Sequence, residues 1–125
     1  MKKQAIHTEQ APRAIGPYSQ ATASGGLMFT SGQLGIDMAT GQLAQGVENQ
    51  AHCAMKNIGA ILRSQHTDYS AILKTTVFVT DMKDFAAINQ VYAQYFEGAC
   101  PARSCVQVAA LPLGGLVEIE CVVAL

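Results

Sequence analysis

Charged residues are scarce in this chain. Of its 125 residues only 14% are charged, against about a quarter in an average domain, while 50% are hydrophobic. So few polar side chains cannot cover a lone monomer, which favours a homo-oligomer that buries apolar surface between subunits. At this length we expect one domain spanning residues 1–125, large enough to build its own core.

Basic residues are few and scattered. The net charge is −1, and Lys2-Lys3 is the only adjacent basic pair. Because a protein that binds a phosphate backbone needs a basic patch or stripe, we expect no nucleic-acid partner. The sequence also lacks a run of eighteen apolar residues and an apolar segment after its first three residues. These absences predict neither a membrane span nor an export signal.

Motifs for metals, cofactors and nucleophiles are missing as well. The four cysteines have no CxxC spacing and lie among apolar residues, which predicts reduced thiols and a cytoplasmic protein. The three histidines have no metal-ligand spacing, and neither a glycine-rich phosphate loop nor a GxSxG motif occurs. The sequence therefore has no recognisable motif for a metal or a phosphate-bearing cofactor.

The first third of the chain has β signals, and an amphipathic helix follows. Tyr18–Ala23 and Leu27–Ser31 are short strand-like runs separated by Ser24-Gly25-Gly26, which predicts a hairpin. Asp37–Gly41 is typical of a turn. From Val47 to Arg63, apolar residues recur at the spacing of a helix with one buried face.

The remaining elements complete an α+β pattern. Lys74–Thr80 is rich in β-branched residues and predicts a strand. Asp84 is a suitable N-cap for a second helix that ends near Gly98, and 102–110 and 116–123 predict two final strands. The order β-β-α-β-α-β-β predicts an α+β fold, mostly a single sheet with two helices on one face.

Alternation within the last two predicted strands separates their side chains into faces. Arg103 and Cys105 share one face of their strand. In the final strand Glu118 and Glu120 lie opposite an apolar face. Each strand therefore has one apolar and one mixed face.

Arg103 is the one arginine inside a predicted strand, since Arg13 and Arg63 fall in a loop and near a helix end. Its guanidinium stays charged, so burial requires a carboxylate or several acceptors. One interpretation is a structural salt bridge to Glu118 or Glu120, or a position on a wet outer face. The other is that its planar fork of donors binds an anionic ligand such as a carboxylate.

Four other residues are weaker candidates, each with a simpler interpretation. Tyr18 follows a Gly-Pro turn that can direct its phenol into a cleft, or it packs against the sheet. Ser31 ends a strand without triad partners, and Asn89 lies beside the apolar stripe of the second helix, where it can bond to a neighbouring loop. Cys105 is a possible nucleophile, but inert core thiols are commoner.

The same residues carry a family resemblance that spans nearly the whole chain. The matching segments are IGPYSQA (15–21), SGQLG (31–35), KTTVFVTDMKDFAAINQVYAQYF (74–96), PARSCVQVAALPLGG (101–115) and VEIE (117–120). Together and in this order they closely resemble the RidA/YjgF family of reactive-intermediate deaminases.

The resemblance implies a fold, a reaction and a set of roles. It implies a chorismate-mutase-like α+β fold, a homotrimer with clefts between subunits, and hydrolysis of 2-imino acids to 2-keto acids and ammonia without a cofactor. Arg103 matches the arginine that binds the substrate carboxylate, and Glu118 matches the acidic residue near the attacking water. The cleft-lining positions of the family fall on Tyr18, Ser31, Asn89 and Cys105.

Three functions remain open at this point. The first is an imine deaminase (a 2-iminobutanoate/2-iminopropanoate deaminase) with Arg103 and Glu118 as catalytic residues. The second is a non-catalytic trimeric protein that binds small carboxylates and acts through partners. The third is an RNA-directed role, because some relatives are described as endoribonucleases or translation inhibitors, and the scattered basic residues make it the weakest.

Overall fold

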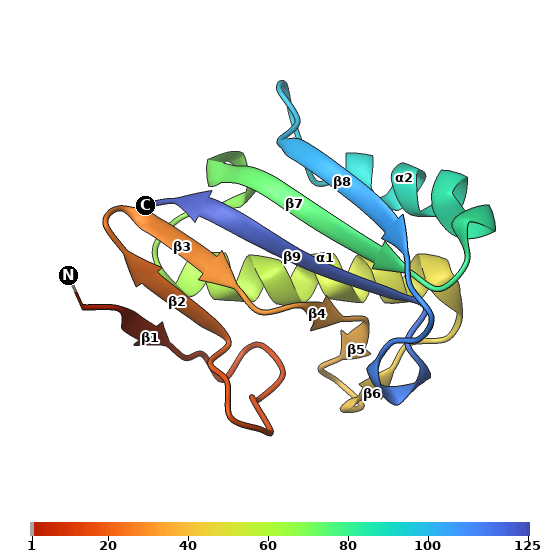
Figure 1. The fold of residues 1–125 in the computed structure, drawn as a ribbon, viewed down its shortest axis with the longest axis horizontal. Helices are drawn as coiled ribbons and strands as arrows, with labels where there is room; N and C mark the ends of the chain where they lie inside the picture. The colour runs from red at the N-terminus through yellow and green to blue at the C-terminus, as the bar shows by residue number, and fades with distance from the viewer. Residues whose placement is uncertain (1) are drawn as a thin grey trace.

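The computed structural model describes residues 2–125, and within them seven strands form one sheet backed by two helices (Figure 1). The sheet runs in the order β1-β2-β3-β9-β7-β8, and β4 also pairs with β9. Its strands are β1 (Gln4–Ile6), β2 (Ala21–Ser24), β3 (Leu27–Thr30), β4 (Gln33–Leu34), β7 (Ile72–Val79), β8 (Ala102–Gln107) and β9 (Val117–Ala124). A separate pair consists of β5 (Ile36–Asp37) and β6 (Gln42–Leu43). The helices are α1 (Gly46–Ser64) and α2 (Phe85–Ala93), and three 3₁₀ turns cover Tyr69–Ala71, Met82–Asp84 and Pro112–Gly114.

The predicted hairpin is confirmed as β2 and β3. Gly25 and Gly26 have φ values of 61° and 79°, the left-handed conformation that a two-residue hairpin turn requires. The first strand of the hairpin, β2, begins later than predicted, at Ala21 instead of Tyr18. Tyr18 lies in a turn instead, where its backbone N–H donates to the carbonyl of Gly16 at 2.8 Å.

Helix α1 packs its apolar stripe against the sheet, as predicted. The buried stripe consists of Ala51, Ala54, Met55, Ile58, Ile61 and Leu62. It covers the inward side chains of the central strands, among them Met28, Val77 and Ile119, which are completely buried. This layer of aliphatic side chains is the core of the domain.

The centre of the sheet is β7, which pairs antiparallel with β9 and parallel with β8. Thr75 of β7 is opposite Arg103 of β8 on one side and Cys121 of β9 on the other. Side chains at paired positions point to the same face of a sheet. Arg103 therefore lies on the face that the helices cover.

Helix α2 is shorter than predicted. It ends at Ala93, not near Gly98. The N–H groups of Tyr95 and Phe96 donate to carbonyls three residues back, at 3.1 and 3.3 Å, which tightens the chain out of the α-helix. Asp84 precedes the helix but makes no side-chain capping bond, because it belongs to a 3₁₀ turn. Strand β8 also stops early, at Gln107.

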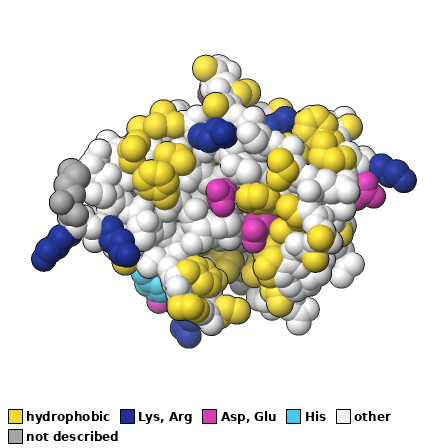
Figure 2. Space-filling view, in the orientation of Figure 1, with side chains coloured by type: hydrophobic (Ala, Val, Ile, Leu, Met, Phe, Trp, Pro, Cys, Tyr) yellow, Lys and Arg dark blue, Asp and Glu magenta, His cyan; other side chains and the backbone are white. Residues whose placement is uncertain are grey.

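No helix in residues 2–125 covers the other face of the sheet, which faces the viewer in Figure 1. Phe29 and Val106 lie on it with 49% and 42% of their surface exposed. Figure 2 shows hydrophobic side chains gathered on this face, with acidic groups among them near its centre. In the described residues, neither helix is long and apolar enough to cross a bilayer.

Candidate active site

Arg103 is half-buried between β8 and α2, and it has no carboxylate partner among residues 2–125. Its Nη1 donates to Oδ1 of Asn89 at 2.6 Å. Its Cζ is 5.3 Å from the ring centroid of Phe85 and 5.0 Å from that of Tyr92, within the range of cation–π contacts. The guanidinium thus keeps most of its N–H donors for another partner.

Cys105 is two residues further along the same face of β8, where it is partly buried against the core. Burial raises the pKa of its thiol, and the positive charge of Arg103 only partly offsets this effect. A thiol with a raised pKa is a poor nucleophile at neutral pH, because the thiolate is the reactive form. The structure therefore favours a lining role for Cys105.

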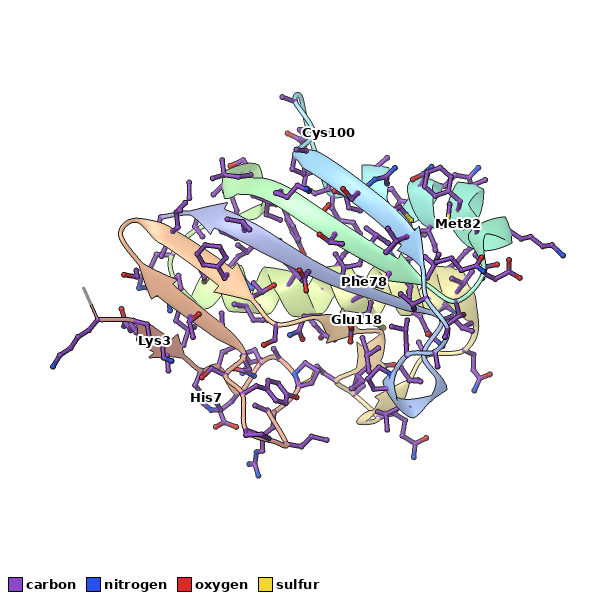
Figure 3. The ribbon with its side chains drawn as sticks, viewed as in Figure 1. Lys3, His7, Phe78, Met82, Cys100 and Glu118 are labelled. Carbon is purple, nitrogen blue, oxygen red and sulfur yellow. The ribbon has the colours of Figure 1, made fainter. Side chains whose placement is uncertain are left out.

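Glu118 is half-buried on the open face of the sheet, where β9 pairs with Leu34 of β4 and Phe78 of β7 (Figure 3). Desolvation by burial raises the pKa of its carboxyl group, and the nearby charge of Glu120 adds to the increase. A Cβ atom at Gly32 would lie 2.6 Å from Cδ of Glu118. Because Gly32 has no side chain, the carboxyl group of Glu118 can occupy this space.

Ser31 and Tyr18 belong to the segments around β2 and β3. The hydroxyl of Ser31 donates to the carbonyl of Ser19 at 2.6 Å, and its N–H donates to the carbonyl of Gln20. These bonds fasten the residue before Gly32 to the segment that carries Tyr18. The phenol of Tyr18 is free to contact a ligand, since 51% of the residue is exposed.

Four of the six predicted residues therefore fall into two groups on opposite faces of the sheet. Arg103, Cys105 and Asn89 are on the helix side. Glu118 alternates with buried Val117 and Ile119, so its carboxylate points away from the helices. The predicted alternative of a salt bridge from Arg103 to Glu118 or Glu120 within the chain is wrong. The arginine points to the helix side of the sheet, and the two carboxylates point to the open side.

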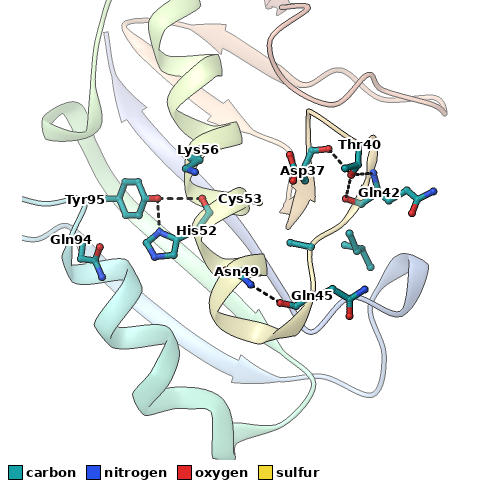
Figure 4. Close-up of a pocket in the computed structure, with 12 residues that line it drawn as sticks. Asp37, Thr40, Gln42, Gln45, Asn49, His52, Cys53, Lys56, Gln94 and Tyr95 are labelled. Carbon is teal, nitrogen blue, oxygen red and sulfur yellow. Dashed lines mark hydrogen bonds between the residues drawn. The ribbon is translucent and has the colours of Figure 1, made fainter.

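A cavity of about 860 Å³ lies on the helix side, between the β5–β6 hairpin, α1 and the end of α2 (Figure 4). His52 and Tyr95 meet in it, with Nδ1 of His52 2.9 Å from the hydroxyl oxygen of Tyr95. None of the six predicted site residues lines this cavity. Within residues 2–125 no group of three or more metal-ligating side chains could hold an ion.

Sequence reasoning missed Phe85, Tyr92 and Gly32 as parts of these two groups. By sequence, Phe85 and Tyr92 are only apolar residues on the face of the second helix that is expected to be buried. Their spacing from Asn89 could have revealed them, because residues at i, i+4 and i+7 share one face of a helix. No signal in the sequence ties Gly32 to Glu118, since that contact depends on how β4 pairs with β9.

Fold and side chains together define a small α+β protein. A half-buried arginine without a carboxylate partner in residues 2–125 lies on the helix side of its sheet, and a carboxyl group with a raised pKa lies on the open side. The family model described as Endoribonuclease L-PSP matches residues 8–125. The chain belongs to this family, which is the RidA/YjgF family indicated by its motifs.

Individual proteins agree with this assignment. The 2-iminobutanoate/2-iminopropanoate deaminase of Capra hircus is 51% identical over 118 residues, which cover 94% of this chain and 86% of the relative. YyfA of the Rid family from Yersinia pestis superimposes with a TM-score of 0.96 at 44% identity and covers 99% of this chain and all of its own. E. coli TdcF, solved with bound serine, gives a TM-score of 0.93 at 42% identity over 98% of each chain. The predicted α+β fold class is confirmed.

Proposed function

We propose that this protein hydrolyses small 2-imino acids, of the 2-iminobutanoate and 2-iminopropanoate type, to 2-keto acids and ammonia. The observation that carries the proposal is the half-buried guanidinium of Arg103, which has an amide and two rings around it and no carboxylate partner in residues 2–125. A buried cation without a counter-charge is unfavourable unless a ligand supplies the charge. The name of the Capra hircus relative points to the same reaction.

In the proposed reaction Arg103 binds the substrate carboxylate through its free N–H groups. Two parallel N–H···O bonds fix the orientation of the acid and place its C=N carbon at a defined position. Tyr18, Ser31 and Cys105 line the cleft around the substrate, and Asn89 holds the guanidinium. No metal and no organic cofactor takes part.

Glu118 is the proposed general base. Its carboxylate takes a proton from water while the water oxygen bonds to the imine carbon, and the C=N electron pair moves to nitrogen, which then takes that proton from Glu118. The resulting carbinolamine collapses: Glu118 moves the hydroxyl proton to nitrogen, the C=O bond forms, the C–N bond breaks, and ammonia leaves. A base in this position contributes on the order of 10²–10⁴ to the rate.

The two groups of residues meet only if two copies of the chain come together. Arg103 and Glu118 lie on opposite faces of one sheet, so we place the site between subunits, with Arg103 from one copy and Glu118 from the next. A homotrimer, which repeats this contact around a threefold axis, closes the arrangement. The low charge content and the exposed Phe29 and Val106 on the open face support burial of that face in the assembly.

The test couples the purified protein to a PLP-dependent threonine dehydratase and follows the loss of the imine intermediate. Wild type should accelerate the loss, and Arg103→Ala should not. Arg103→Lys should also be nearly inactive, because an ammonium is a point charge that cannot form the two parallel bonds. Equal rates for wild type and Arg103→Ala would remove the proposal.

A second candidate is a protein that binds small carboxylates without catalysis. The bound serine in TdcF favours it, since an amino acid offers the same carboxylate. In that case calorimetry with 2-oxobutanoate gives equal affinity for wild type and Glu118→Gln, and neither accelerates imine loss. Under the deaminase proposal Glu118→Gln retains affinity but loses the acceleration.

The free thiols support a proposal about the compartment. Cys53, Cys100, Cys105 and Cys121 are all free. We place the protein in the cytoplasm, because reducing conditions there keep such thiols unpaired.

A further inference from the structure

One face of α2 surrounds the guanidinium of Arg103. Phe85, Asn89 and Tyr92 are spaced at i, i+4 and i+7, which places them in one row along the helix. Each contacts Arg103: the rings lie 5.3 and 5.0 Å from Cζ, and Oδ1 of Asn89 accepts from Nη1 at 2.6 Å. The row thus meets the cation with two π systems and one acceptor.

The Tyr92 ring is fixed by the strand next to Arg103. Its hydroxyl shares a hydrogen bond of 2.7 Å with Oγ1 of Thr75, which is completely buried and is the register partner of Arg103. Phe96 packs on the same ring, with centroids 4.8 Å apart. Burial raises the pKa of the Tyr92 phenol, so its hydroxyl stays neutral at physiological pH. Tyr92 therefore presents an uncharged ring to the arginine.

These contacts use one edge of the guanidinium and its flanks. A single N–H of Nη1 is engaged by Asn89, and the remaining donors of the fork have no partner in residues 2–125. A free arginine side chain has many rotamers, and it loses conformational entropy when it binds a carboxylate through two hydrogen bonds. An arginine that is already held in one rotamer loses less conformational entropy on binding.

We propose that Phe85, Asn89 and Tyr92 are positioning residues that lock Arg103 in the conformation that binds a carboxylate, a role that rests on the proposed function. Asn89 holds the guanidinium through a hydrogen bond, and Phe85 holds it through a cation–π contact. Replacing Phe85 removes the ring on one side of the guanidinium and leaves the hydrogen bonds in place. The lock is formed within one chain, by α2 and β8 together with Thr75 of β7. It is present before any substrate binds.

The test measures the mobility of Arg103 directly. In isotope-labelled wild type, the NMR order parameter of its Nε–Hε bond should be about 0.8, near that of rigid backbone. Arg13 and Arg63 are exposed and give the mobile reference in the same spectrum. Phe85→Leu should lower the value for Arg103, and Phe85→Tyr, which restores an aromatic face, should return it toward wild type.

Ligand affinity gives the second readout. Calorimetry with 2-oxobutanoate should show binding weakened about threefold to thirtyfold in Phe85→Leu, the range of one cation–π contact. Phe85→Tyr should bind within about twofold of wild type. Tyr95→Leu is the matched control, because it removes an aromatic residue near the same helix that contacts His52 and Tyr69 and not Arg103. It should change neither readout.

The two proposals fail in different ways. If Arg103 is as mobile as Arg13 in wild type, or if Phe85→Leu leaves its order parameter unchanged, the lock does not exist. If wild type shows a rigid Arg103 that Phe85→Leu loosens but no imine hydrolysis, the positioning role stands and the deaminase proposal falls.

Discussion

Arg103 and Glu118 are both half-buried and without a counter-charge among the described residues, and at the scale of single residues they set the chemistry of this chain. Neither Arg103 nor Glu118 forms an ion pair within residues 2–125, where the only such pair joins His7 and Glu9 at the surface. Burying an unpaired charge destabilises a fold. Sites that bind or transform a charged ligand commonly accept this penalty, because the ligand or the chemistry needs the charge there.

The pH dependence of unfolding should reveal how much burial of the Glu118 carboxylate destabilises the fold. Its pKa is raised in the folded chain above the ordinary value of 4.5, mainly by burial and then by Glu120. Below pH 4.5 the carboxyl group is mostly neutral in the folded and the unfolded chain, so it does not change the free energy of unfolding. Above the raised pKa it is charged in both, and its burial in the folded chain lowers the free energy of unfolding. Glu118→Gln should therefore raise the melting temperature at pH 8, with a gain that disappears as pH falls to about 4.

Thermal unfolding of wild type and Glu118→Gln across this pH range checks the prediction, with Glu97→Gln as an exposed control. A gain that is constant with pH would contradict it. Imine hydrolysis by wild type should increase with pH through the same interval, because the proposed base acts only when ionised.

At the scale of elements, the sequence predicts what is periodic and local. The stripe of α1 and the alternation along β9 identify their buried faces, and both are confirmed. The relation between Arg103 and Glu118 is different. Alternation separates faces within one strand, but the register through β7 decides which faces of β8 and β9 coincide. The end of α2 is equally non-local, since Tyr95 and Phe96 leave the helix to pack on Tyr69.

Two glycines near β4 should separate function from stability. In Gly32→Ala the atoms nearest the new Cβ all belong to the side chain of Glu118, which can move aside. Hydrolysis should fall by at least about tenfold, because the base is displaced from its position, while unfolding changes little. In Gly35→Ala the new Cβ meets the backbone of Gln50 in α1, which cannot move cheaply. That variant should lose about 1–3 kcal/mol of unfolding free energy.

Urea unfolding and the coupled imine assay, run on both variants, check this pair. Gly26→Ala is unsuitable as a control, because its φ of 79° adds backbone strain. Ala87→Gly, on α2 away from both sites, gives the scale of an ordinary helix change. If Gly32→Ala lost as much unfolding free energy as Gly35→Ala, its loss of hydrolysis could not be assigned to a displaced Glu118, and the prediction would be contradicted.

At the scale of the whole molecule, one sheet carries half of the proposed site on each face. The helix side offers the arginine with its aromatic flanks, and the open side offers the carboxyl group beside Gly32. A single copy of the chain cannot bring these halves together without unpairing β8 from β7. The proposed assembly removes the difficulty, and it also covers the apolar residues of the open face.

Mixed assemblies should reveal whether the halves come from different chains. Arg103→Ala and Glu118→Gln are each expected to be inactive alone. When the two are unfolded and refolded together in equal amounts, about a quarter of the contacts join an intact Arg103 to an intact Glu118 of the neighbour, so about a quarter of wild-type activity should return. If both residues acted within one chain, no mixture of these variants would contain an intact site, and activity would stay at the level of the single variants. Wild type mixed with the double variant separates the cases again, with about a quarter of full activity for a shared site and about half for a site within one chain.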